Sequence, residues 1–125
     1  MATMLIVDDE LDMRMLVRVV IEMANDGLSI VGEAADGAEA LEVWRALDGP
    51  PDPDVVILDN RMPQLTGLEV AKEILQERPG QIIVLYSAFL DERVRAQAAE
   101  LGITRCVSKE ELETLPDLLR ELTSR

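Results

Sequence analysis

Histidine is absent from the sequence, and cysteine occurs once, at Cys106. Without histidine, a histidine-based catalytic triad, a histidine-ligated metal centre and a phosphohistidine carrier are all excluded. A single cysteine cannot form a disulfide within the chain, which suits a reducing compartment such as the cytoplasm. A reactive site in this chain must therefore be built from carboxylates, hydroxyls and amines.

Basic charge, aromatic side chains and long apolar runs are also scarce. The 125 residues carry a net charge of −13 and contain one Trp, one Tyr and one Phe. Such a chain repels nucleic acid and anionic membranes, and it has little with which to stack on bases. No run approaches the ~20 apolar residues of a membrane span, and the start lacks the basic region of a signal peptide. We expect a cytoplasmic protein that binds neither nucleic acid nor membranes directly.

The apolar residues, which make up 48% of the chain, alternate between two periodicities. Short apolar runs indicate strands, and apolar residues three or four positions apart indicate helices. The expected strands cover residues 4–7, 28–34, 55–58, 81–86 and 103–107, and the expected helices 11–24, 38–47, 67–78, 91–101 and 115–124. Turn-forming segments at 25–27, 49–53 and 79–80 separate several of them. This strict alternation predicts one domain, residues 1–125, with a doubly wound parallel α/β sheet.

Several of the expected elements have further detail. Interleaved polar residues place strand 28–34 near a sheet edge. Asp91 can cap the helix that follows it, and Thr114 to Asp117 reads as a capping box with Pro116 in the first helical turn. The apolar stripe of helix 11–24 falls at positions 13, 16, 17, 20 and 23 or 24. The inward residues of helix 67–78 are expected to be Leu68, Val70, Ala71, Ile74 and Leu75.

Reactive side chains stand at the ends of four of the five expected strands. In chain order they are Asp8 and Asp9 with Glu10 beyond, then Asp59, then Ser87, then Ser108 and Lys109. The carboxyl ends of parallel strands meet at one rim, which is where ligands of such sheets bind. Singly, each residue is more often a turn, cap or solvated residue. Their convergence favours a functional site, because Lys109 is one of only two lysines and the other, Lys72, reads as a surface residue.

Oxygen ligands without His or Cys suit a hard cation such as Mg²⁺. A magnesium ion beside a lone amine is typical of phosphoryl chemistry. The sequence has no glycine-rich phosphate loop, so a nucleotide is not expected as the ligand. An aspartate can itself be the nucleophile and form an aspartyl phosphate. Asp59 ends the apolar strand 55–58, where a rigid backbone would hold its oxygen in line with an incoming phosphoryl group.

Four short motifs resemble the receiver domains of bacterial two-component response regulators. They are Val7-Asp8-Asp9-Glu10, Asp59-Asn60-Arg61-Met62-Pro63 with Gly67, Tyr86-Ser87-Ala88, and Val107-Ser108-Lys109. The resemblance extends from residue 4 to about residue 122. It implies a flavodoxin-like (βα)5 fold with five parallel strands in the order 2-1-3-4-5.

The resemblance also implies a role for each matching residue. Asp59 corresponds to the phosphorylated aspartate, Ser87 to the hydroxyl that bonds the phosphoryl group, and Lys109 to the lysine that pairs with it. The implied Mg²⁺ site has Asp9 and Asp59 as direct ligands, Asp8 acting mainly through water, and the backbone carbonyl of Arg61. The implied donor is a sensor histidine kinase or a small phosphodonor such as acetyl phosphate.

The function implied is a phosphorylation-activated switch that signals through protein contacts, either to a separate target or to a fused output domain. Its only chemistry would be its own phosphorylation and dephosphorylation, so it is not an enzyme acting on a substrate. We expect a monomer or a weak, phosphorylation-dependent dimer. The chain is expected to be either a stand-alone receiver or the N-terminal domain of a longer regulator, and Arg125, which follows the last helix without a linker, mildly favours the first.

The chain departs from the usual receiver pattern at three places. Glu110 stands where proline commonly follows the lysine, Cys106 stands where many receivers have an aromatic residue, and the last helix is short. These departures predict an altered switching mechanism and leave the phosphorylation chemistry unchanged. Phe89 and Arg61 flank the expected phosphoryl position, and a phenyl ring there should exclude the hydrolytic water and make the phosphorylated form long-lived.

Two other functions fit parts of the pattern. A small phosphatase of the haloacid-dehalogenase type also uses Mg²⁺ and an aspartate nucleophile. Such enzymes usually have a second aspartate two residues further on, where this chain has Arg61, and a cap for which 125 residues leave no room. A pseudo-receiver that only binds a partner is the other alternative, and the complete set of acidic, hydroxyl and amine residues argues against it. Phosphorylation by a small-molecule donor separates the three functions.

Overall fold

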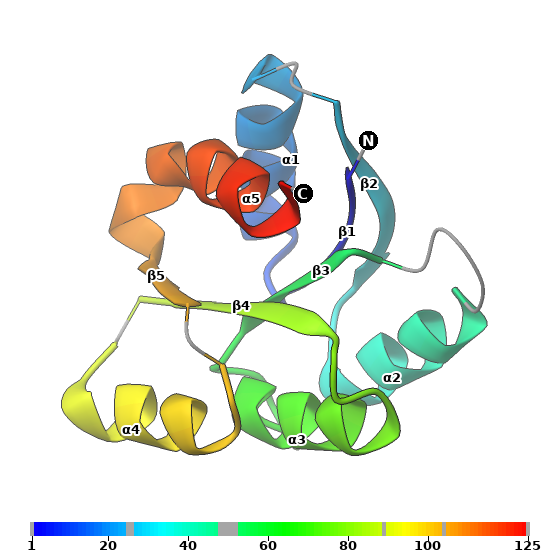
Figure 1. Ribbon diagram of the computed structural model, residues 1–125, viewed down its shortest axis with the longest axis vertical. Coiled ribbons are helices and arrows are strands. Elements are labelled where there is room, and N and C mark those ends of the chain that lie inside the picture. The colour runs from blue at the N-terminus through cyan, green and yellow to red at the C-terminus, as the bar shows by residue number, and fades with distance from the viewer. Residues whose placement is uncertain (1, 25–26, 48–52, 89, 104, 125) are drawn as a thin grey trace.

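The computed structural model describes residues 2–24, 27–47, 53–88, 90–103 and 105–124. It consists of β–α units in strict alternation (Figure 1). The elements are β1 (Ala2–Val7), α1 (Leu11–Ala24), β2 (Leu28–Ala34), α2 (Gly37–Ala46), β3 (Val55–Asp59), α3 (Gly67–Glu77), β4 (Ile82–Ser87), α4 (Glu92–Glu100), β5 (Arg105–Ser108), the 3-10 helix η1 (Lys109–Thr114) and α5 (Leu115–Thr123). Of the expected breaker 49–53, only Pro53 lies among the described residues.

The strands form one parallel sheet in the order β2-β1-β3-β4-β5. This confirms the doubly wound, flavodoxin-like fold and its strand order. The polar-interleaved strand β2 lies at the edge, as expected, and the continuous apolar strands β1, β3 and β4 lie inside. No helix in the described part of the chain is long and apolar enough to cross a membrane.

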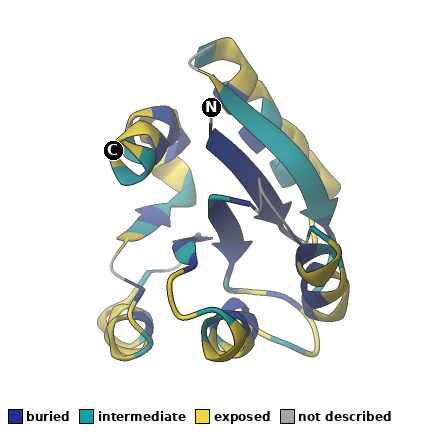
Figure 2. Cartoon of the chain, turned by 45° about the vertical axis from the view of Figure 1, so that its right-hand side comes forward, coloured by how far each residue is buried: buried dark blue, intermediate teal, exposed yellow. Residues whose placement is uncertain are grey.

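Helices cover both faces of the sheet. Figure 1 shows α2, α3 and α4 on one face and α1 and α5 on the other. The side chains of each strand alternate between these two layers. In β1, Leu5 and Val7 pack in the core under α2, α3 and α4, whereas Met4 and Ile6 pack in the core under α1 and α5. Figure 2 shows the resulting pattern, with buried inner strands and helices exposed on their outer sides.

The expected cap of α4 and the expected inner face of α3 are confirmed. The side chain of Asp91 caps α4 by accepting a hydrogen bond of 2.8 Å from the N–H of Val94. Thr66 and Glu69 form a capping box at the start of α3. Of the residues expected to face inward on α3, Val70, Ala71 and Ile74 are fully buried, and Leu68 and Leu75 are partly buried against the same core.

Helix α1 buries only part of the stripe that was expected. Its buried residues are Val17 and Ile21, with Met13 packed against the same core. Leu16 and Met23, which were expected in the stripe, are 46% and 79% exposed. The prediction holds for Met13 and Val17 and is wrong for Leu16 and Met23, because α1 carries apolar residues around most of its circumference. Periodicity alone therefore does not determine which side meets the sheet.

The expected capping box at Thr114 is also wrong. Helix η1 runs directly into α5, so Thr114 has helical backbone angles, with φ −84° and ψ −10°. A capping side chain needs an extended backbone at that position. The Thr114 hydroxyl instead donates to the carbonyl of Glu111 at 2.7 Å. Pro116 does lie in the first turn of α5, as expected.

Candidate functional site

The strand register brings the expected acidic residues to one rim. Val7 of β1 pairs with Leu58 of β3, so the residues that follow them, Asp8 and Asp59, lie side by side. Asp59 in turn pairs with Tyr86 of β4. Because side chains alternate along a strand, Asp8, Asp59 and Tyr86 all project toward the α1 and α5 layer. The site therefore lies at the carboxyl end of the central strands.

Lys109, the first residue of η1, lies at the centre of this rim. Its ammonium is 3.1 Å from Oδ2 of Asp8, 3.4 Å from Oδ1 of Asp59 and 3.9 Å from Oε1 of Glu10. The Lys109 side chain is only 12% exposed, and those of Asp8 and Asp59 are 0% and 2% exposed. One partly buried ammonium thus contacts both buried carboxylates.

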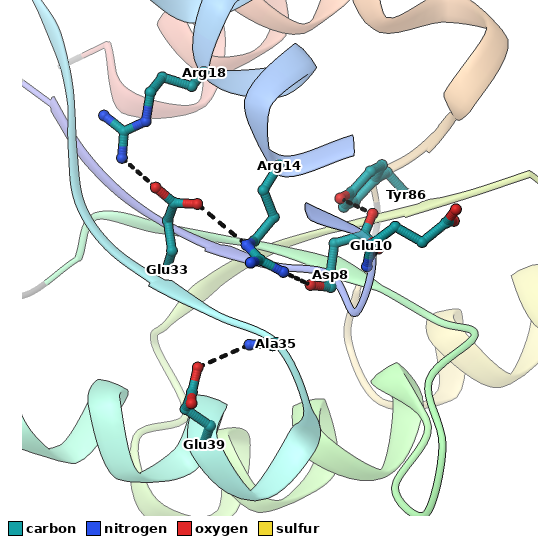
Figure 3. Close-up of polar contacts among 8 residues, drawn as sticks. All are labelled: Asp8, Glu10, Arg14, Arg18, Glu33, Ala35, Glu39 and Tyr86. Atoms are coloured by element: carbon teal, nitrogen blue, oxygen red, sulfur yellow. Dashed lines mark hydrogen bonds and ion pairs between the residues drawn. The ribbon is translucent and has the colours of Figure 1, made fainter. Parts of the chain in front are cut away.

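Asp8 is held by hydrogen bonds from several directions (Figure 3). Its Oδ1 accepts from the backbone N–H of Glu10 at 2.9 Å, and its Oδ2 accepts from the hydroxyl of Tyr86. Its backbone carbonyl accepts from the guanidinium of Arg14 at 2.5 Å. A carboxylate with this many donors has a fixed orientation.

A chain of ion pairs connects this rim to the edge strand. Arg14 of α1 contacts Glu33 of β2 at 3.2 Å, and Arg18 contacts the other carboxylate oxygen of Glu33 (Figure 3). The hydrogen bond from Arg18 lowers the pKa of Glu33, so this carboxyl group stays ionised. Arg14 thus anchors the backbone of Asp8 to a second pair of elements.

The pKa of Asp59 is raised above its usual range. Burial, and then the neighbouring charge of Asp8, raise the pKa of Asp59 to about 6, against opposing contributions from Lys109 and from the backbone N–H of Arg61. That N–H donates to Oδ1 of Asp59 at 3.3 Å. A divalent cation beside Asp59 would favour the carboxylate and lower this pKa.

The two other titratable groups in contact with Asp8 keep their protons. Burial lowers the pKa of Lys109, but the charge of Asp59 and the hydrogen bond and charge of Asp8 outweigh it and raise the pKa overall. The pKa of Tyr86 is raised by burial and by its hydrogen bond to Asp8. The rim therefore combines carboxyl groups with an ammonium and a neutral phenol.

The acidic residues fit a hard cation. Asp8, Asp9 and Glu10 each offer a carboxylate oxygen, and these oxygens lie within 4.8 Å of one another. Asp8 is buried, whereas Asp9 and Glu10 are exposed at the rim. An all-oxygen donor set with open, solvated positions is the environment that Mg²⁺ prefers. Asp59 lies outside this group but adjoins Asp8, so it can close the set from the other side.

The start of α3 holds the end of β3 in place. The N–H of Gly67 donates to the carbonyl of Asn60 at 3.0 Å, and Oδ1 of Asn60 accepts from the N–H of Leu68 at 3.2 Å. A Cβ atom on Gly67 would lie 2.3 Å from the carbonyl oxygen of Asp59. Only glycine allows this approach, which explains its place in the Asp59 motif.

The remaining site residues lie at the adjoining strand ends. Ser87 is the last residue of β4 and is fully buried. Ser108 ends β5 and caps η1, its hydroxyl accepting from the N–H of Glu110 at 3.2 Å. A proline at position 110 could not donate this bond, so the cap of η1 requires a residue other than proline, such as Glu110, at this position. Cys106 is half-buried against the α4 side of the sheet, and burial raises the pKa of its thiol.

Two residues of this site were not predicted from the sequence, and a third residue, which was predicted, lies outside the described part of the chain. Tyr86 and Arg14, which fix Asp8, were not predicted. The sequence does carry a signal for Tyr86, because it is a ring with a polar hydroxyl in an otherwise aliphatic strand. Side-chain alternation along β4 also directs it to the same layer as Asp59. Phe89, expected to shield the phosphoryl group, lies outside the described part of the chain.

Comparison with known proteins identifies the arrangement. A family model described as the response regulator receiver domain matches residues 4–120. The chain belongs to this family. Receiver domains are signalling domains of two-component systems and act as phosphorylation switches. They do not catalyse a reaction on a substrate, and this domain is non-enzymatic in that sense.

The curated relatives differ in how much of their own length this chain covers. The receiver is 34% identical over 114 residues to protein CcdB of Bacillus subtilis, covering 91% of this chain and 90% of that protein. It is 36% identical over 98 residues to chemotaxis protein CheY of Thermotoga maritima, covering 78% and 77%. It is 35% identical to protein-glutamate methylesterase/protein-glutamine glutaminase 3 of Hahella chejuensis but spans only 33% of that protein. No esterase activity is carried over from such a partial match.

Solved structures confirm the fold. The receiver superposes with a TM-score of 0.87 on CheY in the CheX–CheY–BeF3–Mg²⁺ complex of Borrelia burgdorferi, at 22% identity and covering 99% of this chain and 90% of that one. It superposes with a TM-score of 0.81 on the signal receiver domain of the response regulator NarL of Mycobacterium tuberculosis, at 29% identity and covering 99% and 98%.

Proposed function

We propose that this receiver domain accepts a phosphoryl group on Asp59 from a phosphohistidine of a sensor histidine kinase, with Mg²⁺ as cofactor. The observation that carries the proposal is the position of Lys109, whose partly buried ammonium lies 3.1 Å from Asp8 and 3.4 Å from Asp59. A cation beside a strand-end carboxylate is suited to the negative charge of a transferred phosphoryl group.

The chemistry follows from the placement of Asp59. Its carboxylate oxygen forms a bond to phosphorus as the phosphorus–nitrogen bond to the donor histidine breaks, and the imidazole leaves with the bonding electrons. The rigid end of β3 supplies the alignment that such an in-line transfer requires. Lys109 remains protonated and contacts the incoming oxygens. Bound Mg²⁺ would supply further charge neutralisation, held by Asp9 and Asp59, by the carbonyl of Arg61 and through water by Asp8.

The structure of a relative supports the choice of cofactor. The Borrelia burgdorferi CheY complex contains Mg²⁺ together with BeF3, whose fluorines stand in for phosphoryl oxygens. In this chain, the three rim carboxylates within 4.8 Å of one another offer the same class of ligand. We assign to Ser87 the hydrogen bond to the phosphoryl group, which would transmit its arrival from the end of β4.

The surface that meets the kinase is assigned to α1. This helix begins beside the acidic rim and exposes an apolar ridge formed by Leu11, Met15, Leu16, Val19 and Met23. A continuous exposed apolar ridge is typical of a protein–protein contact. A kinase helix packed along it would bring its histidine near Asp59. The signal would pass to a protein target or a fused output domain in the cytoplasm, without direct nucleic acid contact.

Intact-mass spectrometry after incubation with acetyl phosphate and Mg²⁺ tests the proposal. The wild type should gain one phosphoryl group, and the gain should be lost with EDTA or in Asp59→Asn. The matched control is Asp36→Asn, which alters an acid after β2 whose side chain caps α2 at 2.7 Å and which asparagine replaces well as a cap. A phosphorylated Asp59→Asn variant, or an unmodified wild type, would overturn the proposal.

A further inference from the structure

Tyr86 is the sole tyrosine of the chain, and it lies inside the proposed site without belonging to the set of residues assigned to phosphoryl transfer. Its ring is fully buried in the core under α1 and α5. Its hydroxyl donates a hydrogen bond to Oδ2 of Asp8, a residue 78 positions away in sequence. Figure 3 shows the Tyr86 hydroxyl directed at that carboxylate.

The hydrogen bonds to Asp8 divide its two oxygens unequally. Oδ2 accepts from Tyr86 and also contacts the ammonium of Lys109 at 3.1 Å. Oδ1 accepts from the N–H of Glu10 at 2.9 Å. Each carboxylate oxygen has about two lone pairs to offer. Oδ2 is therefore saturated, and the remaining capacity of Asp8 is on Oδ1, on the side of Glu10 and the acidic rim.

We propose that Tyr86 is a positioning residue for the cation site, holding the Asp8 carboxylate so that Oδ1 faces the hydration shell of a bound divalent cation. This inference rests on the proposed function only in requiring that the rim binds Mg²⁺. Groups that orient a metal-binding carboxylate contribute to metal affinity without touching the metal. Tyr86 acts through Asp8 in this way.

Tyr86 is well suited to fix another residue because it is itself immobile. Its Cα pairs with that of Asp59 in the sheet, and its ring is packed between strands and helices. The ammonium of Lys109 lies 5.1 Å from the centre of the ring, a cation–π contact. Arg14 holds the backbone of Asp8 from the opposite direction. The carboxylate thus has a fixed backbone and a fixed hydrogen-bond donor.

A purely structural role gives a different prediction. If the Tyr86 hydroxyl only satisfied a buried carboxylate, Tyr86→Phe would lower the stability of the metal-free protein and leave its affinity for Mg²⁺ unchanged. If Tyr86 positions Asp8, loss of the hydroxyl frees the carboxylate to rotate, and Mg²⁺ binds more weakly. Loss of such a partner typically weakens metal binding by about 10-fold or more.

The experiment measures Mg²⁺ affinity by thermal-shift titration of wild type, Tyr86→Phe and Ile21→Val. Ile21 is buried in the same core and has no polar side-chain atom, so Ile21→Val controls for lost stability. We expect about 10-fold weaker Mg²⁺ binding in Tyr86→Phe and unchanged binding in Ile21→Val. Equal affinity in wild type and Tyr86→Phe would overturn the inference and leave the proposed function intact. No Mg²⁺ binding by wild type would overturn both.

A second measurement on the unaltered protein covers the case in which Tyr86→Phe fails to fold. The chain has one tyrosine and one tryptophan. The tyrosine component of its near-ultraviolet absorption therefore comes from Tyr86 alone. Mg²⁺ should shift the tyrosine band of wild type, since the cation draws charge from the carboxylate that accepts the Tyr86 hydrogen bond. The shift should be absent in Asp8→Asn. A tyrosine band that does not move while Mg²⁺ binds would overturn the inference.

Discussion

The side-chain ammonium of Lys109 lies 3.4 Å from Oδ1 of Asp59, the carboxylate at the end of the central strand β3. Asp8 contacts the same ammonium from the end of β1. Without a cation, two buried carboxylates at neighbouring strand ends would repel each other. Lys109 and a bound Mg²⁺ would both relieve this repulsion, so their effects on stability are linked.

Replacing Lys109 by methionine should therefore destabilise the metal-free protein. Removing one partner of a buried ion pair typically costs about 3 kcal/mol, because it leaves uncompensated buried charge. Urea unfolding in EDTA measures the loss. Mg²⁺ should then raise the stability of Lys109→Met by more than it raises that of wild type.

The matched control for this variant is Lys72→Met, which alters the only other lysine, an exposed residue of α3. We expect it to stay within about 0.5 kcal/mol of wild type, as surface substitutions usually do. If the two methionine variants lose equal stability, Lys109 does not neutralise the buried carboxylates.

Mg²⁺ should stabilise the wild-type fold through the acidic rim. A ligand present at 100 times its dissociation constant adds about 2.7 kcal/mol to the stability of the state it binds. Thermal melting with and without Mg²⁺ should show a rise in the midpoint for wild type and for Asp12→Ala, an exposed acid of the first turn of α1. In Asp9→Ala the rise should be lost. An undiminished rise in Asp9→Ala would remove Asp9 from the site.

Asp59 should make stability fall as pH rises. Burial and the charge of Asp8 raise its pKa from the usual 3.8 to about 6 in the folded state. Between these two pKa values the folded protein holds a proton that the unfolded chain has released. The stability that this proton contributes is fully present below pH 3.8 and is lost as the pH rises through about 6. The shift corresponds to a penalty of at most about 3 kcal/mol on the ionised form.

Asp59→Asn removes that penalty. In EDTA at about pH 7.5 the variant should be more stable than wild type by roughly 1 to 3 kcal/mol, and the difference should vanish toward about pH 4. Urea unfolding of both proteins across this range provides the measurement. A difference that stays constant with pH would show that the pKa of Asp59 is not raised by folding.

Gly67→Ala should disturb the site through the backbone. The added Cβ would lie 2.3 Å from the carbonyl oxygen of Asp59, so the start of α3 or the end of β3 must move. We expect a loss of about 2 kcal/mol and slower phosphorylation by acetyl phosphate, since overpacking typically costs 1–3 kcal/mol. Gly80→Ala is the control, because nothing lies within 4 Å of a Cβ atom there. Equal stability and phosphorylation rates in the two variants would contradict the close approach at Gly67.

The sequence predicted the sheet well because burial left clear patterns in it. The apolar runs of β1, β3 and β4 indicated strands covered on both faces, and the polar-interleaved β2 indicated an edge. The sequence-based prediction failed where a helix has more apolar residues than its buried face can hold. Helix α1 exposes Leu16 and Met23, and its apolar periodicity does not show that the face with Val17 and Ile21 meets the sheet.

The site was predicted in its residues and missed in its contacts. Strand-end positions placed Asp8, Asp59 and Lys109 at one rim, because parallel strands end together. The hydrogen bond from Tyr86 to Asp8 joins residues 78 positions apart and depends on strand order, register and side-chain facing together. The cap expected at Thr114 failed for a similar reason, since η1 precedes α5 and fixes its entry.

Chemical identification of the phosphorylated residue tests the proposed switch most directly. Borohydride reduces an aspartyl phosphate to homoserine, and peptide mass spectrometry then locates the altered residue in the unmutated chain. After incubation with acetyl phosphate and Mg²⁺, homoserine should replace aspartate at Asp59, and the wild-type chain should carry it at no other acid. Homoserine at Asp8 or Asp9, or none at all after phosphodonor treatment, would contradict the assignment of Asp59 as the phosphoryl acceptor.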